Sequence, residues 1–159
     1  MEDKAVKQMQ EIATEYCTLI ESDFLKEGDW LLEFERLLPA LQCAVIALLP
    51  ALIDKSYPMT PNFERRFELF TQLKNKLGDK DTYQMVFDAT FEETLSGSLA
   101  DDLTDIYCEL KYGLVQLDEK MLDNEKVREH WTNGYHLHWG QHLVDAVRYI
   151  YELRVSEKI

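Results

Sequence analysis

Apolar residues recur along most of this chain at the three- and four-residue spacing of an amphipathic helix. The first segment predicts a helix from Asp3 to Leu25, and its apolar face consists of Val6, Met9, Ala13, Tyr16, Cys17 and Ile20. Gly28 and Asp29 then indicate a helix stop followed by a new N-cap, so that Trp30 opens a second helix.

Residues 37–53 form the most apolar stretch of the sequence, and they contain the pentapeptide Leu-Leu-Pro-Ala-Leu twice. Pro39 removes a backbone donor and crowds the preceding turn, so we expect a kink or a fresh helix start there. Pro50 predicts the end of this helix, with a loop from Asp54 to Pro61 after it. Because two prolines interrupt the stretch and it is short for a bilayer, it favours a buried core helix over a membrane span.

A third helix is predicted from Asn62, its cap, to Leu77, with Gly78 closing it. Residues 79–90 indicate an extended connector, since a short strand there lacks an obvious partner. The fourth helix is predicted to begin within residues 91–98 and to reach Met121, on a continuous apolar stripe formed by Leu95, Leu99, Leu103, Ile106, Leu110, Leu114 and Leu117.

The last long helix is predicted from Val127 to Val155. The link of residues 122–126 is short, so the fourth and fifth helices should be antiparallel neighbours. The sequence therefore predicts an all-α fold: a single-domain bundle of five or six helices over residues 1–159, with an antiparallel C-terminal helix pair.

Composition narrows the class of protein. With 30 acidic residues against 17 Lys and Arg, the formal charge is −13, which disfavours binding to nucleic acid and to anionic lipid. Three widely spaced cysteines, Cys17, Cys43 and Cys108, form no CxxC pair and favour a reducing compartment. Charges throughout residues 1–20 argue against a secretory signal. We therefore expect a cytoplasmic protein that has no membrane and no nucleic-acid partner.

Candidate chemistry gathers on the last two predicted helices. At about 100° per residue, His138, His142 and Asp145 share an arc about 60° wide beside the apolar face of the last helix. Asp102, Asp105 and Glu109 occupy a similar arc on the fourth helix. If the chain folds back at Leu122 and both helices have the same rise per residue, residues whose numbers sum to about 244 lie side by side. Asp102 then lies level with His142, and Asp105 level with His138 or Trp139.

Two histidines four residues apart suit a divalent transition-metal ion, and helical bundles commonly build metal sites from facing helices. The predicted ligands are His138, His142, Asp145, Asp102 and Asp105. A structural interpretation remains open beside it: the same groups, with Arg148, hydrogen-bond to one another and lock the helix pair. His138 is followed by Trp139 and not by Glu, so the HExxH pattern of zinc proteases is absent, as are the GxxxxGK[ST], GxGxxG and GxSxG motifs.

Two stretches carry a resemblance to a known family: Asp-Asp-Leu-Thr-Asp-Ile-Tyr at residues 101–107 and His-Trp-Gly-Gln-His-Leu-Val-Asp-Ala at residues 138–146. They resemble a bacterial family catalogued only as a domain of unknown function, and residues 37–41 fit its amino-terminal part more loosely. The resemblance implies a helical, bacterial, intracellular protein and implies no activity for any residue.

Two hypotheses of function follow. The favoured one is a non-enzymatic module that acts through protein–protein contact, with a protein partner or a second copy of the chain. The alternative is a metal-binding bundle, hydrolytic or redox. In it the histidines supply nitrogen ligands, and the carboxylates supply oxygen ligands or orient the imidazoles from behind.

Overall fold

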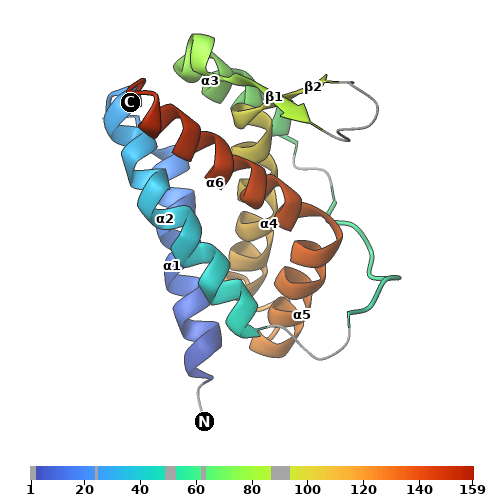
Figure 1. The fold of residues 1–159 in the computed structure, drawn as a ribbon. Coiled ribbons are helices and arrows are strands. Elements are labelled where there is room, and N and C mark those ends of the chain that lie inside the picture. The colour runs from blue at the N-terminus through green and yellow to red at the C-terminus, as the bar shows by residue number, and fades with distance from the viewer. Residues whose placement is uncertain (1–2, 24, 49–52, 62–63, 87–93) are drawn as a thin grey trace.

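The computed structural model describes residues 3–23, 25–48, 53–61, 64–86 and 94–159. Within these ranges the chain forms six α-helices and one β-hairpin (Figure 1), and the predicted all-α bundle is confirmed. The helices are α1 (Lys4–Glu21), α2 (Glu27–Leu48), α3 (Arg66–Leu77), α4 (Leu99–Asp118), α5 (Asn124–Gly134) and α6 (Gly140–Val155), and the strands are β1 (Thr82–Val86) and β2 (Thr94–Ser98).

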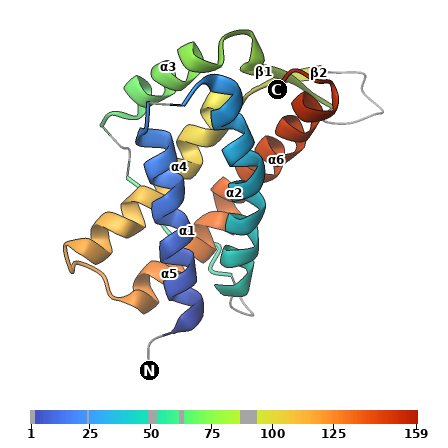
Figure 2. The same cartoon turned by 90° about the vertical axis from the view of Figure 1, so that its left-hand side faces the viewer.

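The core lies between α1, α2, α4, α5 and α6. The side-on view shows α1 packed along α2 on one side and α4 on the other (Figure 2). Tyr16 of α1 is fully buried, and its hydroxyl donates to the Leu103 carbonyl of α4 at 2.8 Å. Three tryptophans, Trp30, Trp131 and Trp139, are fully buried in the same core. No helix among the described segments has the length and apolar character needed to cross a membrane.

The second helix differs from its prediction at two places. It begins at Glu27, so Gly28 and Asp29 lie inside its first turn and do not form a stop and cap. Acidic side chains in a first turn interact favourably with the helix dipole, which explains the early start. The helix also continues through Pro39, so no fresh start occurs there. Pro50 and the predicted cap Asn62 lie outside the described residues.

A β-hairpin replaces the predicted connector and the predicted start of the fourth helix. β1 and β2 pair antiparallel, with Tyr83 opposite Gly97 and Thr82 opposite Ser98. A Cβ at position 97 would overlap the ring of Tyr83, so glycine lets this ring lie across the neighbouring strand. Leu95, which the sequence assigns to the apolar stripe of the fourth helix, lies in β2 and is 49% exposed.

The hairpin determines where α4 begins. The Ser98 side chain caps the helix by accepting from the Asp101 amide at 3.2 Å. Asp81, just before β1, is buried and accepts from the Ala100 amide at 2.7 Å and from the Ser98 hydroxyl at 2.9 Å. The first turn of α4 is therefore anchored to the hairpin, which sets the direction of the acidic side chains that follow.

The predicted last helix is divided into three parts: α5, a π-helical segment at Tyr135–Trp139, and α6. Within the π segment the Gly140 amide donates to the Tyr135 carbonyl, five residues earlier. A Cβ at position 140 would overlap that carbonyl oxygen, so only glycine fits. In Figure 1, α5 and α6 run in clearly different directions on either side of this segment. α6 contacts α4 along the line on which the candidate site lies.

Candidate metal centre

Four carboxylates project from one side of α4, because they recur at the three- and four-residue spacing of a helix: Asp101, Asp102, Asp105 and Glu109. They meet His138 of the π segment and His142 of α6. The side chains of Asp102, Asp105 and Glu109 are 5%, 12% and 6% exposed, so this side of α4 is largely withdrawn from water.

His142 contacts two carboxylates, one with each ring nitrogen. Its Nδ1 lies 2.8 Å from Asp102 Oδ1, and its Nε2 lies 3.1 Å from Asp105 Oδ2. Burial alone would lower the pKa of His142, but its hydrogen bond to Asp102 and the charge of Asp105 outweigh this and raise it. The structure therefore places Asp102 level with His142 along the two helices, as the sequence predicts.

His138 repeats this arrangement one turn earlier. Its Nδ1 lies 3.1 Å from Glu109 Oε1, and its Nε2 lies 3.7 Å from Asp105 Oδ2. Interaction with Asp105, together with the hydrogen bond to Glu109, raises the pKa of His138 to about 10. The two imidazole rings approach edge to face, with centroids 5.1 Å apart. Both Nε2 atoms thus point toward the same oxygen of Asp105.

Glu109 is held by side chains from three different segments. Besides His138, its side chain accepts from the Thr60 hydroxyl, and His130 Nε2 lies 3.4 Å from its Oε2. Burial alone would raise the pKa of Glu109, but hydrogen bonds from His130, His138 and Thr60 lower it to about 2. Glu109 is therefore ionised at any physiological pH.

Arg66 and Tyr83 belong to the site although no pattern in the sequence indicates a role for them. Arg66 of α3 donates from Nε to Asp105 Oδ1 at 2.8 Å and from Nη2 to Asp101 Oδ1 at 2.8 Å. Tyr83 of β1 donates to Asp102 Oδ2 at 2.5 Å. Neither pairing has a local signal, because both partners are distant in sequence. Glu109 does have one, since it shares the arc of Asp102 and Asp105.

Asp145, the fifth predicted ligand, forms no hydrogen bond or ion pair with the other described residues of this cluster, although its charge acts on Asp102. Its carboxylate accepts a hydrogen bond from the Gln141 amide group at 3.1 Å, on the exposed side of α6. The structure thus brings together Asp102, Asp105, His138 and His142, and leaves Asp145 beside them.

Among the described residues, two groups of side chains place potential ligand atoms within 4.8 Å of one another. One contains Asp105, His138 and His142, and the other contains Asp101, Asp102 and His142. The first uses the two Nε2 atoms that face Asp105 and leaves both Nδ1 hydrogen bonds intact. The second provides one nitrogen and requires His142 to give up its hydrogen bond to Asp102. The first group is therefore the better cation site.

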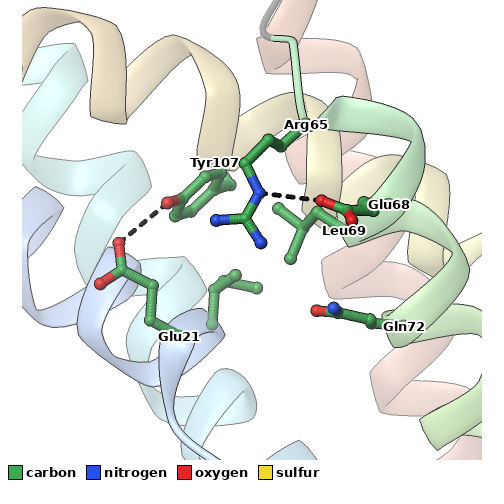
Figure 3. A pocket seen from close by; sticks show the side chains of 7 residues that line it. Glu21, Arg65, Glu68, Leu69, Gln72 and Tyr107 are labelled. Carbon is green, nitrogen blue, oxygen red and sulfur yellow. Dashed lines mark hydrogen bonds and ion pairs between the residues drawn. The ribbon is translucent and has the colours of Figure 1, made fainter.

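The opposite side of α4 carries a different hollow, of about 250 Å³. Figure 3 shows polar groups of this hollow bonded to one another: the Tyr107 hydroxyl donates to Glu21 at 2.8 Å, and Arg65 Nε donates to Glu68 at 2.8 Å. The consecutive residues Arg65 and Arg66 therefore serve opposite sides of α4. The acidic cluster with its two histidines lies on the side of Arg66 only.

Comparison with known proteins places the fold among relatives of undescribed activity. No curated protein matches this chain. The crystal structure of protein BF1032 from Bacteroides fragilis is similar, with a TM-score of 0.72 at 24% sequence identity, over 95% of this chain and 92% of that chain. At this identity the likeness shows a shared fold. Residues 1–156 match the family described as "Domain of unknown function (DUF5063)". The chain therefore belongs to the DUF5063 family, in agreement with the predicted membership of a family of unknown function.

Proposed function

We propose that this protein binds a divalent transition-metal ion between α4 and α6, with Asp105, His138 and His142 as ligands. The observation that carries the proposal is the convergence of His138 Nε2 and His142 Nε2 on one oxygen of Asp105, at 3.7 and 3.1 Å. A nitrogen lone pair that faces a carboxylate oxygen repels it, so each of the two nitrogens needs a hydrogen or a metal ion between itself and Asp105.

The spacing of the donors supports the ion. Zinc binds histidine nitrogen and carboxylate oxygen at about 2.0–2.2 Å, so two ligands of a tetrahedral ion lie about 3.3–3.5 Å apart. The two distances to Asp105 Oδ2 lie on either side of this value. Shifts of a few tenths of an ångström would therefore bring both nitrogens to this distance from Asp105 Oδ2.

The groups behind the two histidines also support the proposal. A histidine that binds a metal through one nitrogen usually donates its other N–H to a carboxylate, which orients the ring and increases its basicity. Here each Nδ1 has its own carboxylate, Asp102 behind His142 and Glu109 behind His138. Tyr83 and Thr60 in turn donate to these two carboxylates, so both rings are held from behind by a hydrogen-bonded chain.

The two carboxylate oxygens of Asp105 have different partners, because Arg66 binds only one of them. Its guanidinium donates to Oδ1 through Nε and Nη2, at 2.8 and 2.6 Å, and leaves Oδ2 for the two histidines. Three protein ligands leave open coordination positions for water or a substrate, as in catalytic zinc sites and in non-haem iron sites with two histidines and one carboxylate. The arrangement thus suits hydrolytic or redox chemistry at a bound ion.

Titration of the chelator-treated protein with Co²⁺ and Zn²⁺ tests the proposal, with Co²⁺ absorption and elemental analysis as readouts. We expect one ion per chain, and loss of that ion in Asp105→Asn, His138→Ala and His142→Ala. His136→Ala is the matched control, because His136 lies in the same π segment with its side chain exposed. Thermal melting of each variant verifies folding.

Two results would refute the site. One is the absence of stoichiometric metal in the wild-type protein. The other is metal that persists in Asp105→Asn but is lost in Asp101→Asn, which would favour the group formed by Asp101, Asp102 and His142.

The protein-contact role favoured by the sequence stays a prediction. The large apolar side chains that the described residues expose most, Met59, Phe67 and Met121, lie on a loop, on α3 and in the link between α4 and α5. They are single exposed residues of a kind common on protein surfaces. The His–carboxylate cluster is the more specific feature, and we therefore place metal binding first.

A further inference from the structure

A cavity of about 220 Å³ adjoins the candidate metal site and shares His138 and Glu109 with it. It lies between the loop of residues 53–61 and the junction of α5 with the π segment. The loop is tied to the helices near both of its ends. The Asp54 amide donates to Asn133 Oδ1 at 3.0 Å, and the Thr60 hydroxyl donates to Glu109. The cavity is therefore built by hydrogen-bonded elements and is ready to receive a ligand without refolding.

Polar groups at the inner end of this cavity are already satisfied. Glu109 Oε1 accepts from His138, and Oε2 accepts from Thr60 with His130 3.4 Å away. With three donors around it, this buried carboxylate offers little further capacity to accept. A cationic ligand would therefore have to compete with existing partners.

At the outer end of the cavity, by contrast, two polar side chains have no hydrogen-bonding partner among the described residues. Lys55 and Tyr57 line the cavity, and in the part of the chain that the structure describes neither Lys55 Nζ nor the Tyr57 hydroxyl has a hydrogen-bond or ion-pair partner. Lys55 is exposed to water and Tyr57 is half-buried. The lining groups without such a partner are thus one cation and one hydroxyl, and both can donate to an acceptor of negative charge.

The remaining lining is apolar. Pro58, Met59 and Leu137 line the cavity, and Met59 and Leu137 are 78% and 46% exposed. An apolar body seated here would remove these side chains from water. The volume is below the range of about 300–1,000 Å³ typical of pockets for larger ligands, so the occupant is small.

The charge of −13 on the chain does not exclude an anion from this cavity. At physiological ionic strength charges are screened beyond about 8 Å, so the groups that line the cavity decide its preference. Lys55 is the lining residue with a free charge, while the charge of Glu109 is compensated by its partners.

We propose that this cavity binds a small carboxylic acid with an apolar body, whose carboxylate accepts hydrogen bonds from Lys55 and Tyr57. The proposal goes beyond the metal site and does not require an ion to be bound.

Binding of sodium benzoate to the chelator-treated, full-length protein tests this proposal. Benzamide and benzylamine serve as neutral and cationic analogues, and ¹H–¹⁵N chemical shifts serve as readout. We expect benzoate to shift the amides of Thr60 and Leu137 and to bind at least about tenfold more tightly than either analogue, the effect of one charge-assisted hydrogen bond. Because the metal is absent, failure here leaves the metal proposal untouched, and the reverse also holds.

Two variants locate the carboxylate. Lys55→Met keeps most of the side-chain stem and Tyr57→Phe keeps the ring, so both remove only the donor. Each should weaken benzoate binding about tenfold. Lys7→Met and Tyr151→Phe are the controls, since both residues are exposed and neither lines the cavity. The proposal is overturned by absence of benzoate binding at millimolar concentration, by equal binding of benzylamine, or by variants that bind as the wild type does.

Discussion

His142 bridges two carboxylates of α4, with Nδ1 2.8 Å from Asp102 Oδ1 and Nε2 3.1 Å from Asp105 Oδ2. Ionised carboxylates accept hydrogen bonds and donate none, so both ring nitrogens carry protons in the metal-free protein when Asp102 and Asp105 are ionised. A metal ion at Nε2 would replace one of these protons. The same exchange applies to His138, whose pKa is raised to about 10 by Asp105 and Glu109.

Metal affinity should therefore increase with pH. The ion must displace a proton from His138, whose pKa is about 10, and this strengthens apparent binding about tenfold per pH unit around neutral pH. The pKa of His142 is also raised, so its titration acts in the same direction. Competition titrations with a chromogenic chelator between pH 6 and pH 8 measure this slope. His136→Ala should show the same slope as the wild type. A pH-independent affinity would contradict ligation by these imidazoles.

Replacing Glu109 with glutamine should destabilise the protein by about 1–3 kcal/mol at neutral pH, because three donors lose a buried charged acceptor. The pKa of Glu109 is lowered from 4.5 to about 2, so its stabilising contribution is complete above pH 4.5 and is lost as the pH falls toward 2. The difference between wild type and variant should shrink over this interval. Urea unfolding at several pH values measures it, with the exposed Glu125→Gln as control.

Replacing Gly140 with alanine should cost about 1–3 kcal/mol, since the new Cβ would overlap the Tyr135 carbonyl of the π segment. The matched control is Gly28→Ala, which lies in the first turn of α2 with no atom near the added carbon. That change should be neutral or stabilise by up to about 1 kcal/mol. Equal melting temperatures for the two variants would show that the π segment tolerates a side chain at this position.

Removing the Tyr83 hydroxyl by Tyr83→Phe should cost about 1–3 kcal/mol, because buried Asp102 loses a donor 2.5 Å away. Tyr151→Phe is the control, since Tyr151 is 63% exposed and a surface change of this kind stays within about 0.5 kcal/mol. Chemical unfolding of both variants gives the comparison. If Tyr83→Phe has no effect on stability, the hairpin does not support the site.

Regular helical periodicity accounts for the part of the site that was predictable. Asp102, Asp105 and Glu109 recur on one side of α4, and the short link before α5 sets them opposite His138 and His142. Both inferences depend on spacing along a single helix or across one turn, and such spacing is visible in the sequence.

The hairpin and its contribution were not predictable in the same way. Leu95 fits the apolar stripe of a helix as well as it fits a strand, and the pairing of Tyr83 with Gly97 joins residues that carry no common local signal. Arg66 reaches Asp105 from α3 through tertiary packing alone. The division of the last helix was missed because a π segment differs from an α-helix by one residue, which apolar periodicity hardly registers.

The geometry of the site also depends on the number of residues in the π segment between α5 and α6. Deleting one residue from Tyr135–Trp139 would restore an ordinary α-helical turn and rotate α6 against α5 by about 100°. Trp131 and Leu143 could then no longer face the same interior, and His142 would swing away from Asp102. The extra residue of the π segment sets the rotation of α6 that brings the imidazoles opposite the carboxylates of α4. A one-residue deletion there would therefore be more damaging than most substitutions.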